Sequence, residues 1–139
     1  MSDAVFREEV FDWILEAEAD LERAKRSFNW EDYSMVCFLS QQVVEKALKA
    51  IIIAFLRERP PHIHDLTVLY SRVKNILDLG EKANMLPEIS QYYITARYPN
   101  AGLRRPSISF TSIQAKRALE IASYVLDRVK EALTRRHSN

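Results

Sequence analysis

The chain has 139 residues, 47% of them hydrophobic and 28% charged, a composition typical of one helical globular domain rather than of a disordered or fibrous protein. Two glycines argue against many tight hairpins, and the single cysteine, Cys37, excludes an internal disulfide and a cysteine-based zinc site. The net charge of +1 conceals an uneven distribution, with eight acids and one arginine in residues 1–22 but nine Lys or Arg against three acids in residues 97–139.

The first predicted helix covers about residues 4–27. Apolar side chains recur at alternating steps of four and three residues, which places them on one helical face that Trp13 widens. These residues are Val10, Ile14, Ala17, Leu21, Ala24 and Phe28. The N-terminal residues lack a basic segment followed by an apolar one, so we expect no secretory signal and a cytoplasmic location.

A second helix is predicted from an N-cap at Asn29, with Asp32 in its first turn, to about Arg57, where a Pro-Pro pair at 60–61 prevents its continuation. This helix contains the longest uninterrupted apolar run of the chain, residues 50–56. Its seven residues are far fewer than the roughly 20 that cross a bilayer, so no membrane span is expected.

Four long polar side chains of the second helix, Gln42, Glu45, Lys46 and Lys49, recur at three- and four-residue spacing and must share one stripe. The rest of this helix is apolar. A polar stripe of mixed charge on such a helix is either a solvated edge or the wall of a cleft that receives a charged ligand. The pattern leaves both interpretations open.

The remaining elements are shorter, apart from the last. A third helix is predicted from about Asp65 to Gly80, and a short fourth helix runs from near Pro87 until Pro99 stops it. A long loop follows at residues 98–110, and long ordered loops often carry function. Thr111 and Gln114 match the capping-box spacing at the start of a final helix over residues 112–136.

Together these elements predict an all-α fold, an antiparallel up-and-down bundle of four to five helices in a single domain spanning residues 1–139. The acidic N-terminal segment and the basic C-terminal segment then have two interpretations. They are either neighbouring helices with complementary charges, or the C-terminal segment offers a basic face to phosphate groups.

Five short motifs occur in a fixed order along the first 99 residues. They are WILEAEADLERA at 13–24, Asp32-Tyr33, QQVVEKALKA at 41–50, His64-Asp65-Leu66 with Leu69, and Arg97-Tyr98-Pro99. In this order they resemble the HEPN family of small prokaryotic helical-bundle proteins, which is similar to the C-terminal domain of kanamycin nucleotidyltransferase.

The resemblance implies a five-helix up-and-down bundle that often forms a homodimer. Members are commonly encoded beside a minimal nucleotidyltransferase, with which they act as a toxin–antitoxin pair, and some are metal-independent ribonucleases. In some pairs the partner adenylylates a tyrosine, a role that the resemblance would give to Tyr98. We expect no cofactor, and the three histidines have no spacing typical of a metal site.

The ribonucleases of this family resemble one another in an Arg-x(4-6)-His motif, in which arginine holds the phosphate and histidine moves protons. After Arg97 the positions that should supply histidine, residues 102–104, are Gly, Leu and Arg. The spacing does occur for Arg57 with His62 or His64 and for Arg59 with His64, in a segment that the two prolines make a loop. The sequence is therefore compatible both with a ribonuclease and with a protein that does not cleave RNA.

The candidate site joins the polar stripe to the later motifs. His64 and Arg97 are the candidate catalytic residues, and the candidate nucleotide- or phosphate-binding residues are Lys46, Lys49, Arg97, Tyr98, Gln42 and Glu45. Each has a structural alternative: His64 could lead into the third helix, Arg97 could pair with an acid such as Glu45, and Tyr98 could pack against the bundle.

Three functional hypotheses follow. The first is a nucleotide- or RNA-phosphate-binding protein that works with a nucleotidyltransferase partner in a toxin–antitoxin-like pair. The second is a metal-independent endoribonuclease that uses His64 and an arginine. The third is a homodimeric scaffold without a ligand, in which the polar stripe forms ion pairs between subunits.

Overall fold

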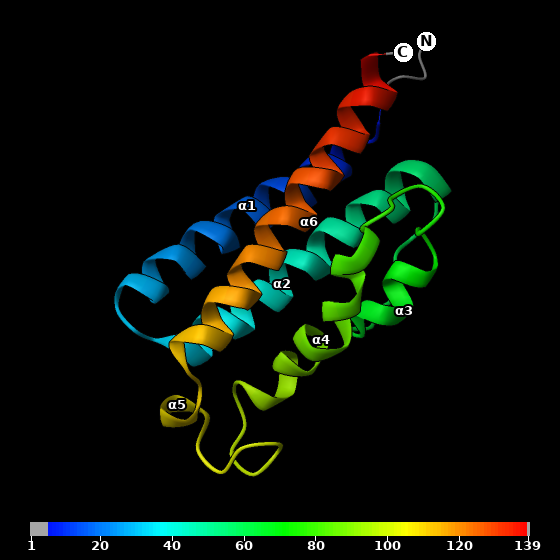
Figure 1. Ribbon diagram of the computed structural model, residues 1–139. Coiled ribbons are helices and arrows are strands. Elements are labelled where there is room, and N and C mark those ends of the chain that lie inside the picture. The colour runs from blue at the N-terminus through cyan, green and yellow to red at the C-terminus, as the bar shows by residue number, and fades with distance from the viewer. Residues whose placement is uncertain (1–5, 139) are drawn as a thin grey trace.

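The computed structural model describes residues 6–138, which form six α-helices and no strand (Figure 1). The predicted all-α bundle is therefore confirmed. The elements are α1 (Glu8–Asn29), α2 (Tyr33–Ile51) with a π-helical extension (Ile52–Leu56), α3 (Leu66–Ser71), a 3-10 helix (Gly80–Met85), α4 (Leu86–Thr95), α5 (Pro106–Ser109) and α6 (Ser112–Ser138).

Helix α2 is the central element and contacts each of the other five α-helices. Figure 1 shows α1 and α2 running in opposite directions, with α6 crossing in front of them and α4 and α3 on the other side of α2. Figure 1 also shows that α1 begins and α6 ends at the same end of the bundle. Since α2 has neighbours on every side, 14 of its 19 residues are buried.

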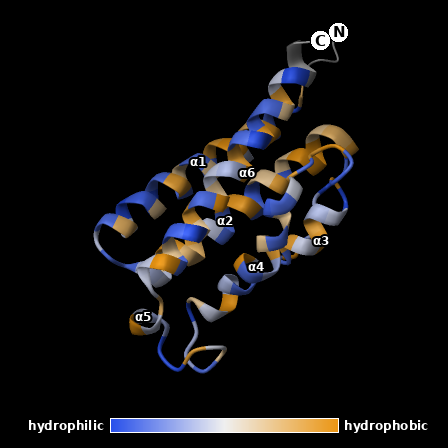
Figure 2. Ribbon diagram, viewed as in Figure 1, coloured by the Kyte–Doolittle hydropathy of each residue, from blue (hydrophilic) through white to orange (hydrophobic). Residues whose placement is uncertain are grey.

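The outer helices are amphipathic, and each carries hydrophilic and hydrophobic residues along its length (Figure 2). The predicted apolar face of the first helix is confirmed, because Val10, Ile14, Ala17, Leu21 and Ala24 are all buried against the core. Within residues 6–138, no helix is long and apolar enough to cross a membrane.

Charged residues from the two ends of the chain form an ion pair between neighbouring helices. Lys130 of α6 lies 2.6 Å from Glu18 of α1, which supports the interpretation that acidic and basic segments pack together. The predicted capping box is also confirmed, since the Thr111 N–H donates to the Gln114 side chain at 2.9 Å and the Gln114 N–H donates to the Thr111 hydroxyl at 3.1 Å.

The predicted third helix is wrong beyond Ser71, where regular α-helix ends and turns follow toward Leu77. Backbone N–H groups here bond three residues back, as in Val73 to Tyr70. The Tyr70 hydroxyl then accepts the N–H of Leu79, which ties the reversing chain back onto α3. The apolar pattern predicted correctly that Val73 and Leu77 are buried in the core. It did not predict the backbone conformation of these residues.

Two other boundaries differ from prediction, whereas the end of the second helix agrees with it. Asn29 is the last residue of α1 rather than an N-cap, because Glu31 adopts a left-handed φ of 61° and makes the turn before α2. The second helix ends at Leu56, as predicted to within one residue, because Arg57 is also left-handed, with φ of 55°. Inside the predicted loop 98–110, Pro106 opens the single turn of α5.

Candidate functional site

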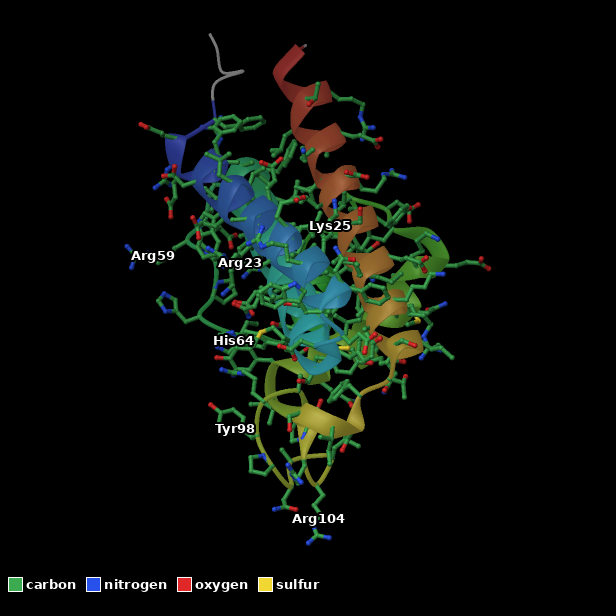
Figure 3. All side chains as sticks on the ribbon, turned by 90° about the vertical axis from the view of Figure 1, so that its left-hand side faces the viewer. Arg23, Lys25, Arg59, His64, Tyr98 and Arg104 are labelled. Carbon is green, nitrogen blue, oxygen red and sulfur yellow. The ribbon has the colours of Figure 1, made fainter. Side chains whose placement is uncertain are left out.

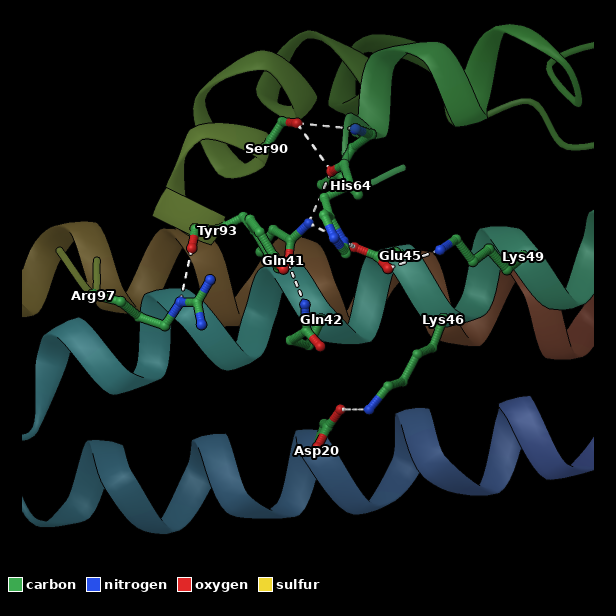
Figure 4. A network of polar contacts seen from close by, with 11 residues as sticks. Asp20, Gln41, Gln42, Glu45, Lys46, Lys49, His64, Ser90, Tyr93 and Arg97 are labelled. Carbon is green, nitrogen blue, oxygen red and sulfur yellow. Dashed lines mark hydrogen bonds and ion pairs between the residues drawn. The ribbon is translucent and has the colours of Figure 1, made fainter. Parts of the chain in front are cut away.

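The polar stripe of α2 faces the segment that leads into α3, and Gln41 joins the two (Figure 4). The Gln41 side chain is fully buried, and its Nε2 donates to the backbone carbonyl of His64 at 3.0 Å and to Glu45 Oε1 at 3.1 Å. Ser90 of α4 holds the other side of this junction, since its hydroxyl accepts the Leu66 N–H at 2.9 Å. The backbone at His64 is therefore fixed by α2 and α4 together.

Glu45 is a buried carboxylate that connects a buried cation to an exposed ring. Lys49 Nζ lies 3.0 Å from Glu45 Oε2, and both side chains are 7% exposed. His64 Nδ1 lies 2.9 Å from Glu45 Oε1, while the His64 side chain is 44% exposed. A carboxylate at one ring nitrogen fixes the orientation of an imidazole and leaves the other nitrogen available to a ligand.

Tyr93 of α4 links His64 to Arg97. The His64 and Tyr93 rings stack with centroids 3.7 Å apart and planes 14° from parallel, and Figure 4 shows Tyr93 between His64 and Arg97. Arg97 Nε donates to the Tyr93 carbonyl at 2.8 Å, and the Arg97 guanidinium carbon lies 4.5 Å from the centre of the Tyr93 ring. His64 and Arg97, which are distant in sequence, thus both contact the Tyr93 ring.

Arg97 also contacts two further rings, those of Phe38 at 4.4 Å and Tyr98 at 5.0 Å. The alternative in which Arg97 pairs with Glu45 is wrong, because Glu45 is taken by Lys49 and His64. No carboxylate within residues 6–138 forms an ion pair with Arg97, and its side chain is exposed. Its outer N–H groups are therefore free to bind an anion.

Lys46 points to a different side of α2 than Glu45 does (Figure 4). Its Nζ is 2.5 Å from Asp20 Oδ2, and the other carboxylate oxygen of this buried aspartate is 2.7 Å from Arg23. Figure 4 shows Lys46 directed toward α1, away from His64. Gln42 remains close to the network, because its Nε2 donates to Gln41 Oε1 at 2.7 Å. The structure thus brings His64 and Arg97 together, whereas Lys46 is held by α1.

Two hollows meet at His64. The first, which we name the loop hollow, has a volume of about 670 Å³ and is lined by α1, the end of α2 and the Glu58–His64 segment. The second, the α4 hollow, has a volume of about 400 Å³ and is lined by the start of α3 and by α4, including Ser90 and Tyr93. His64 borders both.

Sequence reasoning missed several residues of this region, among them Trp13, Gln41 and Tyr93. The apolar pattern places Trp13 only on the buried face of the first helix, yet this side chain lines the loop hollow. For the other two a signal existed: Gln41 lies four residues before Glu45, and Tyr93 lies four residues before Arg97. Side chains at this spacing meet on a helix, so both contacts were within reach of pattern analysis.

Three ionisable groups of the bundle have a shifted pKa, and one of them, Asp65, lines the α4 hollow. Burial raises the pKa of the Cys37 thiol to about 12, so this side chain stays protonated and is not a nucleophile at neutral pH. Burial, with a 2.6 Å hydrogen bond to Glu88, also raises the pKa of Tyr92. The hydroxyl of Thr67 lowers the pKa of Asp65, which caps α3 by accepting the N–H groups of Thr67 and Val68.

A metal site has no support in the geometry of the described part of the chain. Residues 6–138 contain no group of three or more His, Cys, Asp or Glu side chains placed to hold a metal ion. The side chains of the site are an oriented imidazole, an exposed guanidinium and stacked aromatic rings.

The chain has relatives among known proteins. It is 30% identical over 137 residues to "Putative toxin MJ1304" of Methanocaldococcus jannaschii, and the match covers 90% of this chain and 88% of that protein. Its fold matches the crystal structure of TT1696 from Thermus thermophilus with a TM-score of 0.81 and 28% identity, covering 91% of this chain and 99% of the other.

A second solved structure, "ST0689, an archaeal HEPN homologue", matches with a TM-score of 0.71 and 28% identity over 89% of this chain and 97% of the other. The family model of the HEPN domain matches residues 10–132. That range runs from α1 into the last turns of α6, and it includes all five motifs and the polar network from Gln41 to Arg97. The chain therefore belongs to the HEPN family.

Proposed function

We propose that this HEPN protein binds phosphate groups of a nucleotide or of RNA on the surface formed by His64, Tyr93, Arg97 and Tyr98, which we name the His64 face. The observation that carries the proposal is the placement of Arg97, an exposed guanidinium on three aromatic rings without a carboxylate partner in the described chain. An arginine fork held in this way is preorganised for a phosphate oxygen pair.

The neighbouring residues suit the same ligand. Tyr98 is 50% exposed and can stack on a base, as aromatic side chains do in proteins that bind single-stranded nucleic acid. With both ring nitrogens protonated, His64 would donate to Glu45 through Nδ1 and to a phosphate oxygen through Nε2. In this proposal Glu45, Lys49 and Gln42 position His64 through the buried network, whereas Lys46, paired with Asp20 of α1, takes no part in binding.

One part of the proposed cellular setting, the toxin–antitoxin-like pair, draws on a relative. The relative from Methanocaldococcus jannaschii is named as a toxin, which supports a role in a toxin–antitoxin-like pair. We propose a nucleotidyltransferase as the partner, a homodimer as the working form and the cytoplasm as the location. An adjacent reading frame that encodes a small nucleotidyltransferase, together with co-purification of the two proteins, would support this pairing.

The binding proposal is tested with a 5′-fluorescein single-stranded RNA dodecamer, whose polarisation is followed at several salt concentrations. We expect Arg97→Ala to weaken binding about tenfold and to reduce the salt slope by about 0.7, the value for one lost phosphate contact on a single strand. The matched control is Lys116→Ala, which removes one exposed positive charge from α6. Equal affinities of the two variants would remove Arg97 from the site.

A second candidate function is metal-independent cleavage of RNA, favoured by the 2.9 Å contact between Glu45 and His64 Nδ1. A buried carboxylate that orients an exposed imidazole is suited to general acid–base catalysis near neutral pH. RNA incubated with the protein in excess chelator should be cleaved, and His64→Ala should lower the rate at least about 100-fold. Persistent cleavage by that variant would show that another group moves the proton.

A further inference from the structure

The loop hollow beside His64 has no role in the function proposed so far. It exists because Arg57 turns the chain in a left-handed conformation at the end of α2, after which residues 58–64 return along α2 toward His64. Pro60 is buried, so this returning segment is packed onto the bundle. The hollow's volume of about 670 Å³ is within the range of pockets that bind small organic ligands, about 300–1,000 Å³.

Flat and apolar side chains form one part of the hollow. Trp13 is half-buried on α1, Ile53 is 2% exposed, and Pro60 and Pro61 belong to the returning segment. The Trp13 ring is held in place, because Lys49 Nζ lies 5.8 Å from its centre and its Nε1 lies 3.5 Å from Glu9 Oε2. An indole in a hollow with apolar walls is suited to stack on a planar ring.

The positive groups of the hollow are not equivalent. Arg7 lies 3.4 Å from Glu9, and Lys49 is paired with the buried Glu45. Arg59 is exposed, and no ion pair or hydrogen bond joins it to another described residue. Its neighbour Glu58 does not neutralise it, because Glu58 pairs with Arg72. Arg59 is therefore the cation of this hollow that can bind an anionic ligand without losing a protein partner.

The hollow is continuous with the His64 face. His64 lines both the loop hollow and the α4 hollow, so a ligand in the first would adjoin a phosphate held by His64 and Arg97. Figure 3 shows Arg59, His64 and Tyr98 in succession along one edge of the molecule, opposite α6. This is the order in which a single strand could cross the surface.

We propose that the loop hollow is a nucleotide subsite, in which a nucleobase stacks on Trp13 and Arg59 binds a phosphate of the same nucleotide. The inference rests on the proposed function for its place along a bound strand, since the adjoining phosphate would be the one at His64 and Arg97. It adds two residues, Trp13 and Arg59, that determine how tightly and in which register the strand binds.

The experiment uses Trp13 as its own reporter. The other tryptophan, Trp30, is 84% exposed at the turn between α1 and α2, so Trp30→Phe leaves a single indole without disturbing the core. Unlabelled RNA dodecamer and AMP are titrated into this protein while the fluorescence of Trp13 is recorded. We expect both ligands to quench Trp13, and the dodecamer to do so over the concentration range that changes the polarisation of the labelled strand.

Substitutions then separate stacking from a structural role. Trp13→Leu should weaken dodecamer binding about tenfold, whereas Trp13→Phe, which keeps an aromatic ring, should recover most of the affinity. Arg59→Ala should weaken AMP and dodecamer binding, and Lys116→Ala should change neither. Arg97→Ala should weaken the dodecamer while leaving the quenching by AMP unchanged, because AMP needs only the loop hollow.

The outcomes distinguish the two proposals. If the dodecamer binds but does not quench Trp13, and Trp13→Leu binds it normally, the loop hollow is not a base subsite and the His64 face still stands. If AMP quenches Trp13 but Arg97→Ala binds the dodecamer as tightly as the unmodified protein, the subsite stands and the His64 face is wrong. If neither the dodecamer nor AMP quenches Trp13, the loop hollow is not a nucleotide subsite.

Discussion

Glu45 determines the local chemistry of the site more than any other residue. Its two oxygens serve different partners, Lys49 on one side and His64 on the other, and Gln41 donates to the oxygen that faces His64. The carboxylate is buried, so its charge is compensated by the equally buried ammonium of Lys49. His64 is thereby oriented by a group that is itself fixed.

Loss of the Glu45 carboxylate should destabilise the fold, because it leaves the buried charge of Lys49 without a counterion. We expect Glu45→Gln to lower the free energy of unfolding by about 3 kcal/mol, measured by urea denaturation at pH 7. The double variant Glu45→Gln with Lys49→Met should regain most of this loss, since it removes the uncompensated charge as well.

The control for this prediction is an exposed pair of the same type. Lys25 and Glu22 of α1 lie 3.3 Å apart with side chains 52% and 61% exposed, so Glu22→Gln should change stability by less than about 0.5 kcal/mol. Similar losses for Glu22→Gln and Glu45→Gln would mean that burial does not strengthen the Glu45 interaction.

At the scale of single residues, the sequence predicted the polar stripe of α2 but only part of its pairing. The contact between Glu45 and Lys49 follows from their spacing on one helix. The partners of Glu45 and Lys46 on other elements, His64 and Asp20, depend on how those elements pack. Spacing along a helix does not contain that information.

Among the elements, α3 is short and depends on its N-cap. Asp65 accepts the N–H groups of Thr67 and Val68, and the Thr67 hydroxyl lies 2.6 Å from the same oxygen. These hydrogen bonds favour the ionised carboxylate, and they lower the pKa of Asp65 in the folded protein. A helix of six residues has few other hydrogen bonds to stabilise it.

The cap should make part of the stability depend on pH. Because the pKa of Asp65 is lower in the folded than in the unfolded chain, its ionised form stabilises the fold above the ordinary carboxyl range. This contribution is lost as the pH falls through the lowered pKa. Asp65→Asn should therefore reduce the free energy of unfolding by about 0.5 kcal/mol at pH 7, and the difference should vanish at low pH.

Thermal or urea denaturation of both proteins between pH 7 and pH 3 measures this difference. Asp12→Asn, at an exposed carboxylate of α1 without a hydrogen-bond or ion-pair partner in residues 6–138, is the control. If the difference in the free energy of unfolding between the unmodified protein and Asp65→Asn stays constant with pH, ionisation of Asp65 does not contribute to stability.

The errors in element prediction share a cause. Apolar periodicity located Val73 and Leu77 in the core correctly, yet the chain reverses there with turns that keep the same residues inward. Likewise, the left-handed residue Glu31 makes the turn after α1 without the glycine that usually marks such a position. Tertiary packing sets these backbone conformations, so a local pattern does not predict them.

Over the whole molecule, the architecture follows from one sequence property, the apolar surface of α2. A helix that is hydrophobic on nearly every side must be surrounded, and α2 is contacted by all five other α-helices. Among the polar residues of α2, Glu45 and Lys49 belong to the network at His64, whereas Lys46 pairs with Asp20 of α1. The bundle and the position of the polar stripe could therefore be predicted from the sequence, whereas the loop hollow depends on the path of residues 57–64, which the apolar pattern does not determine.

Central packing makes a last prediction about stability. Leu48 lies in α2 with no exposed surface, so Leu48→Ala should leave a cavity and lower the free energy of unfolding by about 3 kcal/mol. Leu15→Ala makes the same chemical change on the outer face of α1, where the side chain is 60% exposed, and should cost less than about 0.5 kcal/mol. Urea denaturation followed by circular dichroism compares the two. Equal losses would contradict the central position of α2, because a surface position and a core position would then respond alike to the same truncation.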